Sequence, residues 1–287
     1  MTESAAPPER RHLWRTSRRT LNLSGKPLIM GILNVTPDSF SDGGLRTDPD
    51  QAVAHAVAMV EAGADIIDIG GESTRPGSIG VSEDEELRRV MPTVERLVAL
   101  LHIPLSIDTT KAAVAARALA AGVEIVNDIS GLTFERELAD VVAEFHAGLV
   151  IMHTRGRPAI MQRDTSYHAL PEEVSAWLAS SMRRAYSAGI ATEQVALDPG
   201  IGFGKDRVGN LELLRSLRRL LHLGRPLLVG SSRKSFTATA AGRNVDSRLF
   251  TTAATVALAV ANGARVLRVH DVAAMRDVAD MAWEIAG

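Results

Sequence analysis

Short apolar runs recur eight times along the chain, and each ends in a polar or glycine-rich cluster. Runs rich in isoleucine, valine and leucine are typical of parallel strands buried on both faces, and stretches with helical spacing separate them. The runs cover residues 28–33, 66–69, 105–107, 125–126, 149–152, 195–197, 227–229 and 266–267. This eightfold alternation predicts an α/β fold, a (β/α)8 TIM barrel. Because strand ends surround the mouth of such a barrel, we expect the polar clusters to converge on one pocket.

Capping signals and glycines mark the ends of the predicted helices. Asp48 followed by Pro49 is typical of an N-cap before the first helical turn, with Gln51 as capping partner. Ser82 with Glu85 repeats the capping-box pattern. Glycines also precede six strand runs, where a left-handed residue would end the preceding helix. These glycines are Gly63, Gly122, Gly148, Gly189, Gly224 and Gly263.

The chain divides into a short N-terminal extension, residues 1–27, and a single barrel domain, residues 28–287. A barrel needs about 250 residues, and the chain has 287. The extension is rich in arginine and lacks the apolar core of a secretory signal. We expect residues 1–9 to be disordered and the rest of the extension to cover the bottom of the barrel. A transit peptide is the alternative interpretation.

Composition narrows the classes of partner. The formal net charge is −2 and aromatic residues make up 4% of the chain, which argues against nucleic-acid binding. No apolar stretch approaches the ~20 residues of a membrane span, so we expect no membrane partner. The chain contains no cysteine, which excludes disulfides and fits a reducing compartment. We therefore expect a cytoplasmic protein that acts on small molecules.

Polar residues after several runs have the chemistry to bind a flat heterocycle. Asp108, Asn127 and Asp198 stand at the ends of the third, fourth and sixth runs. Carboxylates accept paired N–H donors, and an amide can both donate and accept. Lys234, after the seventh run, adds a cationic donor for a ring carbonyl or nitrogen. Each aspartate alone could cap a helix or pair with a lysine, but their shared placement favours a ligand site.

A second group of residues is suited to an anion. Arg268 and His270 follow the eighth run, just before a helix expected to begin near Asp271. A helix N-terminus with these side chains attracts anions, and barrels often bind phosphate near their seventh and eighth strands. Asn34, at the end of the neighbouring first run, offers an amide oxygen for Mg²⁺. We therefore predict an anion and Mg²⁺ site on this side of the mouth.

Three further features admit either a structural or a functional interpretation. Met152 either packs against a flat ligand or fills core space. His153 could ligate zinc, but no second histidine or cysteine has suitable spacing. The glycine-rich segment 200–204 matches a dinucleotide-binding fingerprint only loosely and lacks its strand–helix setting, so we do not assign that function to it.

Seven of these clusters together resemble the motifs of the dihydropteroate synthase family, in family order. They are GILNVTPDSFSDGG (31–44), DIGGESTRPG (68–77), SIDT (106–109), NDISG (127–131), DPGIGF (198–203), SRKSF (232–236) and RVHDV (268–272). The resemblance covers roughly residues 28–286. One departure is Thr154, which stands where the family pattern has methionine.

The resemblance implies a transferase that condenses 6-hydroxymethyl-7,8-dihydropterin pyrophosphate with 4-aminobenzoate, giving 7,8-dihydropteroate and pyrophosphate in folate biosynthesis. It assigns the pterin to Asp108, Asn127, Asp198 and Lys234. It assigns the pyrophosphate, with Mg²⁺, to Asn34, Arg268 and His270. It assigns the aminobenzoate side to Thr74, Arg75, Phe203, Lys234 and Ser235. Met152 and Gly202 complete the substrate-binding set. Catalysis would involve Lys234, Arg268 and, in the first loop, Phe40 and Asp42.

Family resemblance also implies a homodimer through the late helices, where the sequence itself shows only apolar stretches such as residues 253–261. Two other functions remain as alternatives. A methyltetrahydrofolate methyltransferase of the same barrel group should lack the motif at 232–234 and the two long signature loops. A non-catalytic pterin-binding paralogue should have lost some of the strand-end residues, and all of them are present here.

Overall fold

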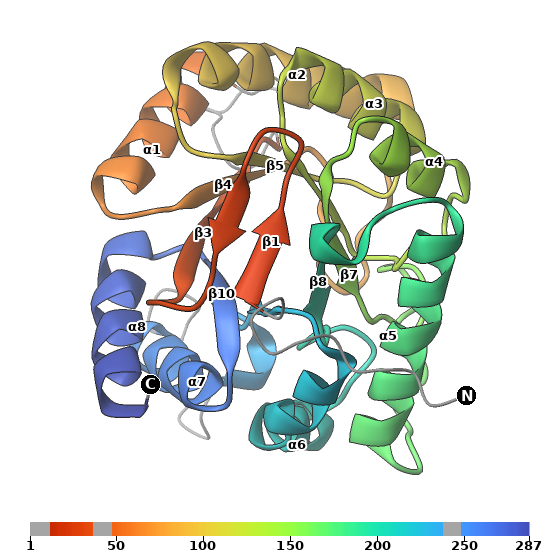
Figure 1. Cartoon of the computed structure of the whole chain (residues 1–287), viewed down its shortest axis with the longest axis vertical. Helices are drawn as coiled ribbons and strands as arrows, with labels where there is room; N and C mark the ends of the chain where they lie inside the picture. The colour runs from red at the N-terminus through yellow and green to blue at the C-terminus, as the bar shows by residue number, and fades with distance from the viewer. Residues whose placement is uncertain (1–11, 37–47, 238–247, 287) are drawn as a thin grey trace.

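The computed structural model describes residues 12–36, 48–237 and 248–286. Within them, eight parallel strands close into a barrel, in the order β10-β3-β4-β5-β6-β7-β8-β9. The strands lie at the centre and the helices surround them (Figure 1). The predicted TIM barrel is therefore confirmed. Among the described helices, none is both long and apolar enough to cross a bilayer.

Every predicted apolar run lies within one of the barrel strands. The strands are β3 (Leu28–Asn34), β4 (Ile66–Gly70), β5 (Leu105–Asp108), β6 (Ile125–Asp128), β7 (Gly148–Met152), β8 (Val195–Asp198), β9 (Leu227–Val229) and β10 (Ala264–Val269). The helices between and after them are α1 (Pro49–Glu61), α2 (Glu83–Leu100), α3 (Ala112–Ala121), α4 (Glu137–Glu144), α5 (Leu170–Ser187), α6 (Arg207–Arg215), α7 (Leu249–Ala261) and α8 (Val272–Ala286). Short 3-10 helices occur at η2 (Thr192–Gln194), η3 (Leu217–Leu223) and η4 (Ser235–Thr237).

The strand register brings the predicted polar residues to one level of the barrel. Asn34 pairs with Gly70, Gly70 with Asp108, and Asp108 with Asn127. On the other side of the barrel, Met152 on β7 pairs with Asp198 on β8. All residues of β4 to β8 are buried, because helices cover the outer face of the barrel and side chains from the strands fill its interior. The sequence-predicted strand ends therefore do converge on one mouth.

The capping residues are confirmed, and Gln51 is the partner of Asp48 as predicted, with its Nε2 donating to Oδ2 of Asp48 at 3.1 Å. Asp48 accepts a hydrogen bond from the backbone N of Asp50 at 2.8 Å, and Ser82 accepts one from the backbone N of Glu85 at 3.3 Å. The Glu85 carboxylate does not return to Ser82, because it bonds to the guanidinium groups of Arg88 and Arg89 instead. The second half of the capping box is therefore replaced by ion pairs within α2.

Gly148 does not end a helix in a left-handed conformation, unlike the other five glycines of that set. His146, with φ 50°, takes that position after α4. Gly148 begins β7 instead. A side chain there would lie 3.3 Å from the carbonyl oxygen of Arg15 and 3.4 Å from Nε1 of Trp14. The close approach of the N-terminal segment thus explains why residue 148 is a glycine.

That N-terminal segment forms a hairpin of β1 (Leu13–Arg15) and β2 (Thr20–Asn22), with β1 drawn across the barrel strands in Figure 1. Trp14 is fully buried, and its Nε1 donates to the Gln194 carbonyl oxygen at 2.9 Å. Thr16 and Arg19 both bond to the buried carboxylate of Glu124, at 2.6 and 2.7 Å. Trp14 packs with one residue from most of the barrel strands, namely Met30, Ile66, Ile125, Val150, Ala196, Leu228 and Val266. These residues lie toward the strand N-termini, away from the polar mouth.

Candidate active site

A half-buried guanidinium joins two buried carboxylates inside the mouth. Arg268 Nε donates to Oδ2 of Asp68 at 2.6 Å, and Nη2 donates to Oδ2 of Asp108 at 2.6 Å. Burial alone would lower the pKa of Arg268, but the two carboxylates raise it above its ordinary value. This cation is therefore permanent, and it spans the barrel from β10 to β4 and β5.

The position of Arg268 corrects the sequence analysis. Arg268 lies within β10 and not after it, and α8 begins only at Val272. Val266, two residues earlier on the same strand, belongs to the inner barrel cluster. Side chains alternate along a strand, so Arg268 also faces the barrel interior. Its contacts are the carboxylates and not the helix N-terminus.

His270, in contrast, lies between the end of β10 and the start of α8, as predicted. Its backbone N donates to the Ser232 hydroxyl at 3.2 Å, and its Nδ1 lies 3.1 Å from the same oxygen. Burial, followed by the charges of Arg268 and Arg233, lowers the pKa of His270 to about 3. The ring is therefore neutral at pH 7, so hydrogen bonding, and not charge, is what it can offer an anion.

Asp68 is the central acceptor of the mouth, although it is not among the site residues predicted from the sequence. It is fully buried in β4, and Oδ2 accepts from both Arg268 and the side-chain amide of Asn127, the latter at 2.9 Å. Among the described residues, no partner contacts its Oδ1. The available signal was a carboxylate inside an otherwise apolar run, because a buried charge requires polar partners. Asp68 thereby orients Asn127 and Arg268 together.

Two further ionisable groups share the pocket. Burial raises the pKa of Asp198, and its Oδ1 accepts from the backbone N of Gly200 at 2.7 Å. Burial raises the pKa of Asp108 to about 7, with Arg268 opposing the rise. Burial lowers the pKa of Lys234 to about 8, with Asp198 opposing the fall. Asp108 and Lys234 thus titrate close to neutral pH, which suits a site that exchanges protons with a bound heterocycle.

Lys234 also lies between the polar residues of the mouth and an aromatic side chain. Its Nζ donates to the carbonyl oxygen of Ile201 and lies 4.5 Å from the centre of the Phe203 ring. Phe203 packs with Met152 in a small apolar cluster that also contains Ile129 and Met161. This cluster is distinct from the main core, so it offers an apolar surface beside the carboxylates. The two predicted residues Met152 and Phe203 are therefore brought together.

The glycine-rich segment 200–204 folds around a buried lysine. Lys205 Nζ donates to the carbonyl oxygens of Gly200 and Phe203, both at 2.8 Å, and lies 2.9 Å from Nδ1 of His153. Burial lowers the pKa of His153 to about 2, with Lys205 adding to the effect, and burial also lowers that of Lys205. His153 therefore serves as an acceptor that fixes this loop, a role the sequence analysis did not foresee.

The other predicted residues lie around the rim. Thr74 and Arg75 are on the loop between β4 and α2, residues 71–81, which we call loop two; Thr74 is half-buried and Arg75 exposed. Ser235 is exposed at the start of η4. The Gly202 backbone N donates to Oδ1 of Asn210 at 2.6 Å. Asn34 is half-buried at the end of β3. Phe40 and Asp42 lie outside the described residues.

Comparison with known proteins places this mouth in a family. Residues 30–270 match the family model described as pterin binding enzyme. The dihydropteroate synthase of Synechocystis is 49% identical over 263 residues, which are 89% of this chain and 90% of that protein. The fold is similar to that of Yersinia pestis dihydropteroate synthase in a sulfonamide drug complex, with a TM-score of 0.89, 42% identity, and coverage of 95% of this chain and 98% of that one.

A second similar structure is Xanthomonas albilineans dihydropteroate synthase in complex with 7,8-dihydropteroate. Its TM-score is 0.84 at 42% identity, with coverage of 95% of this chain and 98% of that one. Sequence similarity therefore extends over nearly the whole barrel, including each of the strands that carries a polar residue of the mouth. The chain belongs to the dihydropteroate synthase family of pterin-binding enzymes.

Proposed function

We propose that the mouth of this dihydropteroate synthase binds 6-hydroxymethyl-7,8-dihydropterin pyrophosphate and 4-aminobenzoate and joins them. The products are 7,8-dihydropteroate and pyrophosphate, in folate biosynthesis. The observation that carries the substrate assignment is the buried network of Asp68, Asp108, Asn127 and Arg268. Such a network recognises a flat ring with paired donors and acceptors at its edge.

The pterin would lie among the strand-end residues, with its ring against Met152 and Phe203. Asp108 and Asp198 would accept its N–H groups, and Asn127 would supply an amide. Lys234 would donate to a ring carbonyl or nitrogen. This arrangement is supported by the burial of both aspartates, since buried carboxylates need donors and a ligand would provide them.

The pyrophosphate would lie on the β3 and β10 side, near Asn34, Arg268 and His270. The residues present fit Mg²⁺, which commonly uses one or two protein oxygens and takes the rest from phosphate and water. Asn34 offers one such oxygen, and the described residues contain no group of three or more histidine or acidic side chains that could form a complete cage. When bound, Mg²⁺ would neutralise charge on the leaving pyrophosphate.

In the reaction, the carbon–oxygen bond between the pterin methylene and the pyrophosphate breaks, and the aniline nitrogen forms the new bond to that carbon. Arg268 stabilises the charge that develops on the leaving group, and His270 donates a hydrogen bond to it. No strong base is needed, because the neutral nitrogen attacks first and its proton then passes to the released pyrophosphate. Water must be kept out because it competes for the electrophilic carbon. Phe40 and Asp42, which follow β3 in the sequence, would assist that closure.

Three further features belong to the proposal. The enzyme would act as a homodimer in the cytoplasm, and residues 12–27 would serve as a lid on the bottom of the barrel. The dimer is supported by large apolar side chains exposed on α7 and α8, where protein–protein contacts would cover them. These side chains are Phe250, Leu258, Met281 and Ile285.

The deciding experiment measures pyrophosphate release with each substrate alone and with both together. We expect release that depends on both substrates. Methyl transfer from methyltetrahydrofolate in place of condensation would favour the methyltransferase alternative. Tight pterin binding without any turnover would favour a non-catalytic binding protein.

Replacing Asp198 with asparagine should weaken pterin binding and leave the fold intact. Asparagine can still accept from the Gly200 backbone N, but it loses the charge that pairs with Lys234 and the pterin. A lost charged hydrogen bond of about 1.5–3 kcal/mol corresponds to roughly 10- to 150-fold in affinity. Calorimetric titration with the pterin measures it, and Asp206→Asn at the exposed N-cap of α6 is the matched control. Unchanged affinity in folded Asp198→Asn would refute the assignment.

Sulfonamides should inhibit competitively against 4-aminobenzoate. The related Yersinia pestis enzyme forms a sulfonamide complex, and Thr74, Arg75, Phe203 and Ser235 follow the family pattern in this chain. We expect the apparent KM for 4-aminobenzoate to rise with inhibitor while kcat stays constant. Inhibition that persists unchanged at high 4-aminobenzoate would contradict a shared site.

A further inference from the structure

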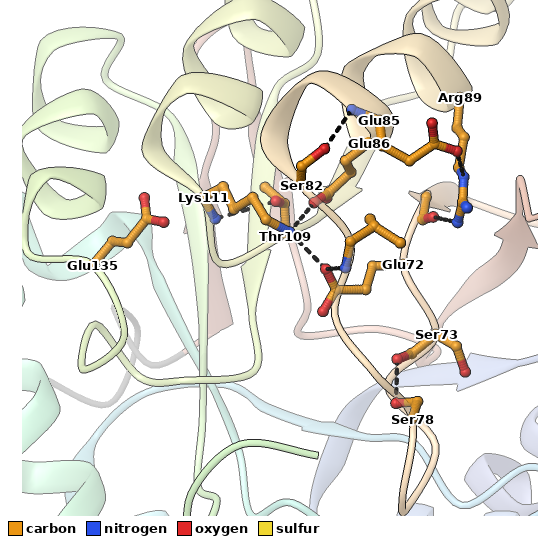
Figure 2. Close-up of polar contacts among 12 residues, drawn as sticks. Glu72, Ser73, Ser78, Ser82, Glu85, Glu86, Arg89, Thr109, Lys111 and Glu135 are labelled. Carbon is orange, nitrogen blue, oxygen red and sulfur yellow. Dashed lines mark hydrogen bonds and ion pairs between the residues drawn. The ribbon is translucent and has the colours of Figure 1, made fainter. Parts of the chain in front are cut away.

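A cluster of buried ion pairs joins the base of loop two to the start of α3 (Figure 2). Lys111 Nζ donates to Oε2 of Glu72 at 2.6 Å and to Oε2 of Glu86 at 2.5 Å. Glu72 lies at the start of loop two, Glu86 in α2 and Lys111 at the N-cap of α3. Two consecutive βα units of the barrel, β4–α2 and β5–α3, therefore meet at one ammonium group.

The anchor of this cluster is rigid. The Glu86 side chain is 1% exposed, whereas those of Lys111 and Glu72 are 17% and 20% exposed. Burial raises the pKa of Glu86, and the hydrogen bond and charge of Lys111 oppose that rise. The start of α3 is fixed independently, because Glu135 accepts from the backbone N of Ala112 at 2.8 Å. Lys111 thus has a fixed backbone and one fixed partner.

Glu72 is the end of the cluster that belongs to loop two. Its Oε2 also accepts from the backbone N of Val81 at 3.1 Å, so one carboxylate closes the neck of loop two. Arg89 of α2 donates to the carbonyl oxygen of Gly71 at 2.9 Å, beside the same neck. At the tip of the loop, the Gly77 backbone N donates to the Pro158 carbonyl oxygen at 3.0 Å. Loop two is therefore held mainly at its base.

The cluster lies between the two halves of the proposed site. Lys111 follows Asp108 by three residues, and its backbone N donates to the Thr109 hydroxyl at 3.2 Å. A cavity of about 90 Å³ has Asp108, Glu72, Thr74 and Lys111 in its lining. Any displacement of Glu72 would therefore move Thr74 relative to the pterin pocket.

We infer that Lys111 is a positioning residue: anchored by Glu86, it holds Glu72 and so sets where loop two presents Thr74 and Arg75 to 4-aminobenzoate. This inference rests on the proposed function, which gives loop two the aminobenzoate side of the site. Lys111 itself touches neither substrate in this arrangement. Its loss should consequently affect aminobenzoate and not the pterin.

Two variants separate positioning from stability. Glu72→Gln removes the ion pair to Lys111 but keeps an oxygen for Val81, and it leaves the Lys111–Glu86 pair intact. The double variant Lys111→Met/Glu86→Met removes both buried charges together, which is commonly tolerated when apolar side chains replace a buried ion pair. Lys111→Arg keeps a cation that can pair with both Glu72 and Glu86, so this variant should bind 4-aminobenzoate as the wild type does. Lys26→Met, which breaks an exposed ion pair with Asp280, is the control.

The readouts are hydrogen exchange of residues 71–81, the KM for 4-aminobenzoate and the Kd for the pterin. In Glu72→Gln and in the double variant we expect exchange in this segment to be about tenfold faster, from loss of a charged contact. The KM should rise about tenfold or more through misplacement of the loop. The pterin Kd should stay within about twofold, since Asp108 keeps its contact with Arg268. Lys26→Met and Lys111→Arg should match the wild type.

Unchanged exchange and unchanged KM in folded Glu72→Gln would overturn the inference, and this variant also decides the matter if the double variant does not fold. A parallel loss of pterin affinity and KM would overturn it too, because the cluster would then support the whole mouth. Wild-type protein that fails to condense the two substrates would overturn the proposed function instead. In that case, faster hydrogen exchange of residues 71–81 in Glu72→Gln would still support the role of Lys111 in holding loop two. Unchanged exchange would still refute that role.

Discussion

Arg268→Met should remove most of the condensation activity and destabilise the barrel at the same time. Methionine has a similar length, but it leaves Asp68 and Asp108 without the guanidinium that now donates to both. Removing one partner of a buried ion pair costs about 3–5 kcal/mol of stability. Loss of a preorganised donor to the leaving group should lower kcat by about 10²- to 10³-fold. Denaturant unfolding and steady-state turnover measure the two effects.

The destabilisation should depend on pH in a defined direction. Burial raises the pKa of Asp108 from 3.8 to about 7, and Arg268 limits the rise. Between pH 3.8 and about pH 7, Asp108 keeps its proton in the folded protein but has lost it in the unfolded chain. The contribution of Asp108 to the free energy of unfolding therefore falls as pH rises. Without Arg268 the pKa of Asp108 rises further, and the loss continues above pH 7.

The loss in the free energy of unfolding of Arg268→Met, relative to the wild type, should therefore be larger at pH 8 than at pH 5. Arg219→Met is the matched control, because Arg219 and its partner Glu172 are both largely exposed and such pairs contribute little. An equal deficit at both pH values would show that the carboxylates are not the cause. Turnover within a few-fold of the wild type would refute the role of Arg268 in the mouth.

The sequence predicted the barrel and the level of the site for a physical reason. Parallel strands covered on both faces must be apolar throughout, so their runs are visible without an alignment, and their polar ends mark the mouth. Asp108, Asn127 and Asp198 were identifiable because each breaks an apolar run at its end. Their burial and common level in the structure follow from the closed register.

The pairing of these residues could not be predicted in the same way. Arg268 and Asp68 are 200 residues apart, and no periodicity specifies which strand of a closed barrel a side chain reaches across to. Asp68 lay inside an apolar run and not at its end, which concealed it. Lys205 follows the glycine-rich segment and Lys111 stands at the start of a helix, and only the fold supplies their buried partners. Sequence thus specified the composition of the mouth but not its internal contacts.

Adding one methyl group at Gly200, in the turn that carries Phe203, tests the internal contacts of the mouth. Gly200 has φ +71°, and a Cβ at this position would lie 1.9 Å from the carbonyl oxygen of His153. That oxygen belongs to the backbone at the end of β7, so it cannot rotate away. Gly200 also donates to Asp198 and accepts from Lys205, so a shift of the turn disturbs both buried charges. Gly200→Ala should therefore move the whole segment 200–204.

We expect Gly200→Ala to lose about 1–3 kcal/mol from overpacking, with about 1–2 kcal/mol more from the left-handed backbone. Turnover should fall about 100-fold, because Phe203 and the carbonyl oxygen that binds Lys234 are displaced. Gly224→Ala is a matched control: its φ is +72°, and a Cβ there meets nothing within 4 Å. That variant should show the backbone cost alone, with normal turnover. If the two alanine variants lose equal stability and both turn over normally, close packing of the segment on His153 is not what holds the site.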